Sequence, residues 1–229
     1  MPFVVAIDGP AGSGKGTITK LIAQELGLVN IDTGAMYRCI TLKGIRQGIN
    51  CLDRKEELIQ IAKDVNIHIE NYNGDQQTFL DGENVTIEIR SKEVSDFVSQ
   101  LSSIPEIREI VVDLSRKIAE GKDIIMEGRD ITTVVFPEAQ VKIYLDTDVE
   151  ERAKRRFAEN QAKGIEGSYE QVLENIKLRD YNDMHKKVGA LKIAEDAIVV
   201  DTTKMTIEEV KEKVKNIILE NKNMINHKK

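Results

Sequence analysis

The amino-acid sequence predicts an α/β fold: a doubly wound, five-stranded parallel sheet with a small antiparallel insertion and a helical lid. Two patterns lead to this prediction. Short apolar runs rich in β-branched residues alternate with stretches of helical spacing along most of the chain. Between residues 65 and 90 the spacing of apolar residues becomes two instead, which is typical of antiparallel strands with one buried face.

The parallel sheet begins with a strand that we predict at residues 3–7. Glycines follow it at once, and Ile18, Ile22 and Leu26 then indicate a helix that ends at Gly27. Unbroken apolar runs, typical of strands covered by helices on both faces, recur later in the chain. They predict the other four strands at residues 28–31, 123–127, 141–145 and 197–201.

The antiparallel insertion is predicted from alternation and from turn residues. Asn73-Gly74 and Asp81-Gly82 favour tight hairpin turns. We expect one strand of the insertion over Val85–Arg90, and a helix that starts after Pro105 and ends at Gly121. The alternating apolar positions are Val65, Ile67, Ile69, Val85, Ile87 and Ile89.

With 229 residues, the chain fits a single domain. We expect its core to comprise residues 1–38 and 121–222, and the insertion to comprise residues 39–120. The lid and its flanking helices are expected at about residues 150–185, within the core.

Composition excludes several classes of protein. Lysine plus arginine number 33 and aspartate plus glutamate 39, a formal net charge of −6. This balance argues against a general nucleic-acid or membrane-surface binder, although a local basic pocket could hold a small anion. No apolar run approaches the ~20 residues that span a bilayer, and Cys39 and Cys51 form no metal or redox motif. We expect a cytoplasmic protein, without nucleic-acid or membrane partners, and a monomer because no coiled-coil heptads appear.

The strongest chemical signal is the run Gly9-Pro10-Ala11-Gly12-Ser13-Gly14-Lys15-Gly16-Thr17. It fits the pattern G-x-x-x-x-G-K between a predicted strand and a predicted helix, which marks a sheet of the P-loop NTPase type. Glycines let several backbone N–H groups point at a phosphate, and Lys15 supplies a mobile charge for the β- and γ-phosphates of ATP. Gly16 replaces the usual Ser or Thr ligand of Mg²⁺. Either Thr17 binds the ion, or water and nucleotide oxygens hold most of it.

Two polar clusters directly follow the second and third predicted strands. They are Asp32-Thr33-Gly34-Ala35-Met36-Tyr37-Arg38 and Glu127-Gly128-Arg129-Asp130. Open α/β sheets bind ligands at the carboxyl ends of their strands, and Arg38 and Arg129 offer guanidinium groups suited to phosphate. A helix-capping turn with a solvated Arg38 and a local salt-bridged loop at Arg129 are the alternatives.

Later in the chain, arginine recurs at helical spacing. Arg152, Arg155 and Arg156 fall in one predicted helix, and Arg179 and Asp183 stand four residues apart in the next. On their own these residues fit a solvated charged helix. Together with a phosphate loop they indicate a mobile lid whose arginines neutralise a transferred phosphoryl group and exclude water.

These segments together resemble the bacterial cytidylate kinases, which are nucleoside-monophosphate kinases of the P-loop class. The resemblance extends from Ile7 to about Val214. Its combination of a phosphate loop, Gly128-Arg129-Asp130 and a large insertion is specific, and it implies that the insertion is the monophosphate-binding segment. The matching segments are Ile7-Asp8-Gly9-Pro10, Gly14-Lys15-Gly16-Thr17, Asp32–Arg38, Gly128-Arg129-Asp130, Val134-Val135-Phe136-Pro137 and Arg179-Asp180.

The resemblance also implies roles for individual residues. The ATP phosphates are assigned to residues 9–17, and the catalytic set to Lys15, Arg38, Arg129, Arg152, Arg155 and Arg156. Positions around the nucleobase are Thr33, Ser99, Arg108 and Asp130; Arg38 and Arg129 lie near the acceptor phosphate, Arg179 and Asp183 around the sugar and phosphates. The chain departs from the family at Lys186, often Arg, and Ala190, often Pro. Lysine keeps the charge of arginine but loses its planar fork.

The expected activity is transfer of the γ-phosphoryl group of ATP, with Mg²⁺, to CMP and dCMP. Independently of the resemblance, Asp130 could accept a hydrogen bond from the cytosine amino group while Arg108 donates to the ring nitrogen. Two alternatives stay open. One is another kinase of this class acting on UMP, AMP or a sugar acid, and the other is a nucleotide-binding switch or regulatory module without transfer activity.

Overall fold

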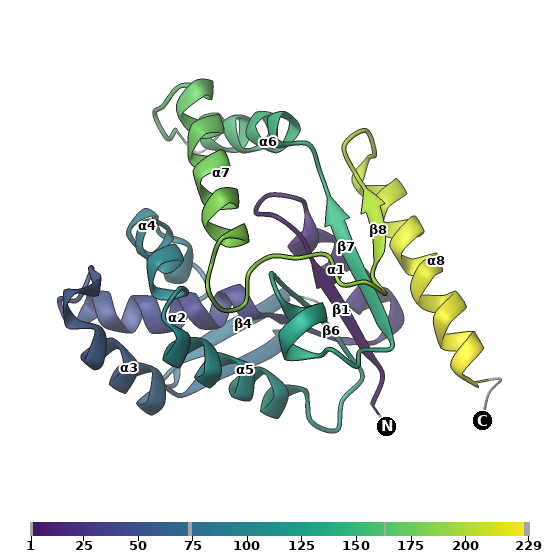
Figure 1. The fold of residues 1–229 in the computed structure, drawn as a ribbon, viewed down its shortest axis with the longest axis horizontal. Helices are drawn as coiled ribbons and strands as arrows, with labels where there is room; N and C mark the ends of the chain where they lie inside the picture. Colours follow the sequence, from purple (N-terminus) through teal and green to yellow (C-terminus); the bar gives the residue numbers. More distant parts are fainter. Residues whose placement is uncertain (1, 73–74, 163, 227–229) are drawn as a thin grey trace.

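The computed structural model describes residues 2–72, 75–162 and 164–226, arranged as Figure 1 shows. Five parallel strands form the central sheet in the spatial order β2-β6-β1-β7-β8. Every boundary lies within one residue of its predicted position, so the predicted parallel sheet is confirmed. The strands are β1 (Val4–Asp8), β2 (Val29–Asp32), β6 (Ile124–Gly128), β7 (Val141–Asp146) and β8 (Ile198–Asp201).

Helices cover both faces of this sheet because its strands bury side chains in both directions. Val5 and Ile7 pack with helices α1 (Lys15–Leu26) and α8 (Ile207–Asn226), whereas Ala6 points to the opposite face. That face is covered by helices α2 (Thr33–Arg46) and α5 (Pro105–Ala119). Both layers are built mainly from buried apolar side chains, as expected for a doubly wound sheet.

The insertion holds a second sheet of three antiparallel strands in the order β3-β4-β5. The predicted turn at Asp81-Gly82 is confirmed, since both residues have positive φ, 51° and 88°. Asn73-Gly74 lies outside the described residues. The elements of the insertion are η1 (Leu52–Arg54), α3 (Lys55–Asp64), β3 (Ile67–Tyr72), β4 (Asp75–Leu80), β5 (Glu83–Asn84), η2 (Glu88–Arg90) and α4 (Lys92–Leu101).

The predicted strand over Val85–Arg90 is wrong. Pairing with β4 stops at Asn84, because the Thr86 hydroxyl accepts the hydrogen bond from the Thr78 amide at 2.9 Å. The chain then turns helically, with the Ile89 amide donating to the Val85 carbonyl at 3.0 Å. Both of these residues are buried, whereas Ile87 is 89% exposed. The spacing Val85–Ile89 fits a helical turn as well as it fits a strand, so alternation alone could not decide.

Two helices, α6 (Val149–Ala162) and α7 (Tyr169–Met184), lie beyond the carboxyl ends of β1 and β7 at the top of Figure 1. The second begins with a capping box, in which the Ser168 side chain accepts from the Gln171 amide and the Gln171 side chain accepts in return from the Ser168 amide. Among the described helices, none is both long enough and apolar enough to cross a membrane.

Strand β1 ends in a fully buried carboxylate, Asp8. Its oxygens accept hydrogen bonds from the Ile131 amide at 2.9 Å, the Thr132 amide at 2.8 Å and the Thr132 hydroxyl at 2.6 Å. Burial raises the pKa of Asp8, and these donors oppose the rise. The interaction fixes the π-helical turn η3 (Ile131–Val135), and with it the preceding segment Gly128–Asp130, to the centre of the sheet.

We expect Asp8→Ala to lower the free energy of unfolding by about 2–4 kcal/mol, because three donors would stay buried without their acceptor. Urea denaturation at neutral pH measures the change. Asp96→Ala is the matched control, since Asp96 is an exposed carboxylate paired with Lys92, and its loss should cost less than about 0.5 kcal/mol. Equal losses in the two variants would show that Asp8 does not anchor η3.

Candidate active site

A cleft of about 1300 Å³ opens at the carboxyl ends of the parallel strands, between the phosphate loop, the insertion and α7. Eight lysine and arginine side chains line it against five carboxylates, although the whole chain is acidic. Such a wall attracts anions. The charged lining residues are Lys15, Lys20, Arg38, Arg90, Arg108, Arg129, Arg179 and Lys186, with Asp32, Glu88, Glu127, Asp130 and Asp183.

The loop from Gly9 to Thr17 has the backbone conformation that binds an anion. A Cβ atom at Gly9 would lie 2.3 Å from the Leu145 carbonyl oxygen, so only glycine fits where the loop leaves β1. Helix α1 starts after Gly14, which has φ 87° and provides no side-chain cap. The first amides of α1 therefore keep free hydrogen atoms, and a phosphate group is a natural acceptor for them.

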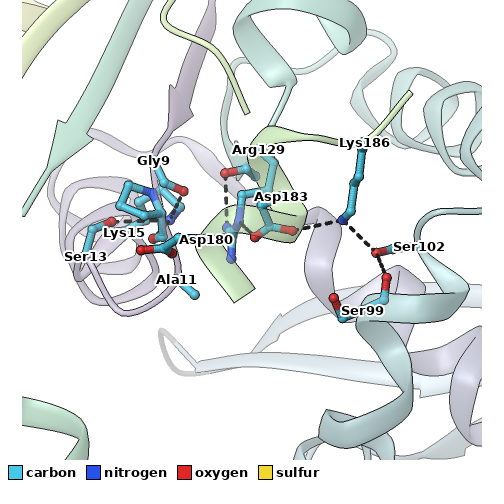
Figure 2. Close-up of polar contacts among 12 residues, drawn as sticks. Gly9, Ala11, Ser13, Lys15, Ser99, Ser102, Arg129, Asp180, Asp183 and Lys186 are labelled. Atoms are coloured by element: carbon cyan, nitrogen blue, oxygen red, sulfur yellow. Dashed lines mark hydrogen bonds and ion pairs between the residues drawn. The ribbon is translucent and has the colours of Figure 1, made fainter. Parts of the chain in front are cut away.

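Lys15 lies folded back into this loop (Figure 2). Its Nζ atom donates to the carbonyl oxygens of Gly9 and Pro10, both at 2.8 Å, and to Ser13 Oγ at 3.3 Å. Burial and the nearby charge of Arg129 lower the pKa of Lys15. An entering phosphate would give this ammonium group a charged acceptor in place of neutral carbonyls.

Glu127, at the end of β6, lies close to Gly16. A Cβ atom at Gly16 would lie 2.8 Å from Glu127 Oε1, so a larger residue at this position would require the carboxylate to shift. Burial, together with the charge of Asp32, raises the pKa of Glu127. Sequence reasoning gave Glu127 no role. The sequence signal that could have pointed to Glu127 was Gly16, which stands directly after Lys15 in place of the usual Ser or Thr.

Three of the predicted arginines reach the cleft from three different elements. Arg38 on α2 donates to the Ile89 carbonyl at 3.0 Å and to Ser95 Oγ at 2.9 Å, and burial lowers its pKa. Arg129, just after β6, donates from Nε to Asp183 Oδ2 at 2.8 Å. Burial and the charge of Arg129 lower the pKa of Arg179, on α7, to about 10. These three guanidinium groups line one cleft and together favour the binding of an anion there.

At the other end of the cleft, Arg108 and Asp130 form a buried ion pair. Arg108 also donates to the Ser102 carbonyl at 3.1 Å and lies 5.8 Å from the centre of the Tyr37 ring. Thr33 is buried nearby and donates to the Glu127 carbonyl at 2.9 Å. A carboxylate beside a guanidinium group presents an acceptor next to a donor, which is the complement of one edge of cytosine.

A chain of polar contacts runs from Arg129 toward the Arg108 end of the cleft (Figure 2). Asp183 accepts from Arg129 at 2.8 Å and from Lys186 at 2.9 Å, and Lys186 also donates to Ser102 Oγ at 3.0 Å. The Ser102 hydroxyl donates in turn to the carbonyl of Ser99, another residue that lines the cleft. Lys186 stands where the family often has Arg. Its ammonium group lies in the site, where it contacts Asp183 and Ser102.

The three arginines expected in the lid do not line the cleft. Arg152 is buried, and it forms a two-point ion pair with Asp180 at 3.0 and 2.6 Å and donates to the Ala11 carbonyl at 3.0 Å. Arg155 pairs with Glu151 and Arg156 with Glu159. In this structure Arg152 joins the lid to the phosphate loop, and a contact between these arginines and a nucleotide stays a prediction.

Comparison with known proteins agrees with this geometry, because residues 5–220 match the family described as Cytidylate kinase. The chain belongs to the cytidylate kinase family. The cytidylate kinase of Caldicellulosiruptor bescii is 50% identical over 210 residues, 92% of each chain. That of Caldanaerobacter subterraneus is 50% identical over 217 residues, 95% of each. The resemblance inferred from the sequence motifs is confirmed.

The architecture also recurs at low sequence identity. A crystal structure of an uncharacterized protein from Eubacterium ventriosum superposes with a TM-score of 0.51 and 12% identity, covering 95% of this chain and 98% of that one. At this identity the likeness concerns the fold alone. Membership of the family therefore rests on the sequence comparisons.

Asp183 should make the stability of the protein depend on pH. Burial alone would raise the pKa of Asp183, but the charges of Arg129 and Lys186 hold it well below its usual range. Its contribution to stability is therefore present above about pH 4 and is lost as the pH falls toward the folded-state pKa. We expect Asp183→Asn to lower the free energy of unfolding by about 3 kcal/mol at pH 7.

Urea denaturation at several pH values measures this contribution. The difference between the original protein and Asp183→Asn should shrink by about 1 kcal/mol between pH 5 and pH 3. Asp96→Asn, which changes an exposed carboxylate, serves as control and should show little dependence over the same range. A difference that stays constant with pH would mean that the two cations do not stabilise ionised Asp183.

Proposed function

We propose that the chain transfers the γ-phosphoryl group of ATP to CMP, and also to dCMP, giving CDP or dCDP and ADP for pyrimidine nucleotide metabolism. One observation carries the proposal: a single cleft holds a phosphate loop at one end and a buried Arg108–Asp130 pair at the other, with guanidinium groups between them. The names of the relatives, all cytidylate kinases, support CMP as the acceptor. That the enzyme acts as a monomer stays a prediction.

The ATP phosphates are expected along the amides of residues 9–17, with Lys15 turned outward from the Gly9 and Pro10 carbonyls. Asp32, Glu127 and Thr17 also line the cleft, and their side-chain oxygen atoms are ligands that suit Mg²⁺. Among the described residues, no group of three or more metal-binding side chains occurs. The site thus fits an ion held largely by water and nucleotide, and bound Mg²⁺ would neutralise charge on the phosphates.

The acceptor needs no general base, because a phosphate oxygen of CMP is already an anionic nucleophile. Arg38 and Arg129 are expected to place that phosphate in line with the γ-phosphoryl group, and Arg179 to share its charge. Positioning and fixed positive charge then supply the rate enhancement. Water must be excluded when both nucleotides are bound, since an open site would hydrolyse ATP.

The base is expected to lie against Arg108 and Asp130, near Thr33 and Ser99. Asp130 would accept from the exocyclic amino group of cytosine, and Arg108 would donate to the adjacent ring nitrogen. Uracil presents a carbonyl oxygen where cytosine has the amino group, which leaves the Asp130 carboxylate unpaired and costs about 1–3 kcal/mol.

Lys15→Ala should lower kcat by at least about a hundredfold, because the substitution removes the one ammonium group inside the phosphate loop. Coupled measurement of ADP release with saturating ATP and CMP gives kcat. Lys92→Ala is a matched control on the exposed side of α4 and should retain normal turnover. Near-normal turnover of a folded Lys15→Ala protein would contradict the assignment of the loop.

A panel of acceptors tests the function itself. ADP release should depend strongly on CMP and dCMP, and only weakly on UMP and AMP. In Asp130→Asn the ratio of kcat/KM for CMP to that for UMP should narrow by roughly tenfold or more, because an amide can pair with either base. Asp96→Asn should leave the ratio unchanged. Unaltered selectivity in folded Asp130→Asn would show that Asp130 does not contact the base.

A further inference from the structure

Arg90 lines the cleft from the insertion, and neither the sequence motifs nor the proposed mechanism uses it. Five arginines line the described part of the cleft. Arg38 is held by a carbonyl and a hydroxyl group, and Arg108 and Arg129 are each paired with a carboxylate. The side chain of Arg90, like that of Arg179, makes no hydrogen bond or ion pair with any residue that the structure describes.

The turn that carries Arg90 is nevertheless held firmly. On its outer side Arg46 forms ion pairs with Glu83 and Glu88. On its inner side Arg38 donates to the carbonyl of Ile89, the residue directly before Arg90. Glu88, the carboxylate nearest in sequence, is thus engaged by Arg46 and is not available to neutralise Arg90.

This turn also decides where Arg90 points. The sequence predicted a strand over residues 85–90. The helical turn instead buries Ile89 and leaves Arg90 exposed at the cleft. The charge of Arg90 acts on two groups there: it helps to lower the pKa of Arg38, and it opposes the rise in the pKa of Glu127 that burial causes. Arg90 lines the same cleft as Arg38, which is expected at the acceptor phosphate.

We propose that Arg90 binds the phosphate of the acceptor nucleotide, and that it does so from the insertion. The inference rests on the proposed placement of the acceptor phosphate at Arg38 and Arg129. A dianionic phosphate there would join cations from three separate elements: α2, the segment after β6, and η2. A nucleoside without a phosphate would fill the base pocket but leave Arg90 without a partner.

Comparison of CMP with cytidine isolates this role. Calorimetric titration of the full chain, without ATP, gives the Kd of each ligand for the original protein and for Arg90→Gln and Arg90→Lys. We expect Arg90→Gln to raise the Kd of CMP roughly tenfold to a hundredfold, as for loss of a charge-assisted hydrogen bond. The Kd of cytidine should stay within about twofold, and Arg90→Lys should recover part of the affinity for CMP.

Arg54→Gln is the matched control, because Arg54 is an exposed arginine of the same insertion that pairs with Glu57. It should leave both dissociation constants unchanged. Equal losses for CMP and cytidine in Arg90→Gln would show that Arg90 only supports the shape of the insertion, and no loss for either would make it a solvated surface residue. Either result overturns the inference. If the original protein does not bind CMP more tightly than cytidine, the proposed function fails instead.

Discussion

The whole site depends on a fold that holds several positively charged arginine side chains close to one another. Burial and neighbouring arginines lower the pKa values of Arg38 and Arg179, whereas burial of Arg129 is outweighed by the charges of Asp183 and Glu127, which raise its pKa. Each could relieve the repulsion by turning toward solvent. The fold prevents this by giving two of them fixed acceptors: the Ile89 carbonyl and Ser95 for Arg38, and Asp183 for Arg129. The electrostatic repulsion between these arginines therefore persists until an anionic substrate neutralises it.

Two buried carboxylates make this arrangement possible and belong to different parts of the chain. Asp8 ties the η3 turn to the sheet, which sets the position of the loop that carries Arg129 and Asp130. Asp183 then holds Arg129 from α7 and brings Lys186 toward Ser102. Preorganisation of the cations is therefore a property of the core and the lid together, not of the phosphate loop alone.

Much of the fold could be predicted from the sequence because its signals were local and redundant. Each parallel strand was a short, mainly apolar run followed by glycine or polar residues, and no predicted boundary was wrong by more than one residue. The stretch from Val85 to Arg90 was different. Its alternating apolar residues fit a strand and a helical turn equally well. The strand ends because the Thr86 hydroxyl, instead of a backbone carbonyl, accepts the hydrogen bond from the Thr78 amide of β4. A tertiary hydrogen bond of this kind leaves no trace in apolar spacing.

The same limit applies to the site. Motifs placed Lys15, Arg38, Arg129 and Asp130 near a ligand because they follow buried strands, where open sheets bind ligands. Finding Glu127 required knowledge of its close approach to Gly16, which lies on α1 and is far from Glu127 in the sequence. Arg90 could not be placed at the cleft from the sequence, because the alternating apolar residues did not reveal the helical turn that carries it.

Arg152 shows how the lid can be linked to ATP without touching it. Its side chain binds Asp180 on α7 and the Ala11 carbonyl of the phosphate loop, so the start of α6, the lid and the loop share one buried guanidinium group. Any shift of Ala11 that accompanies phosphate entry must therefore move Arg152 or break its bond. Since α7 also carries Arg179 and Asp183, a shift of the phosphate loop would be transmitted through this helix to the part of the cleft that Arg179 and Asp183 line. The two nucleotides would then influence each other through this helix as well as through their phosphates.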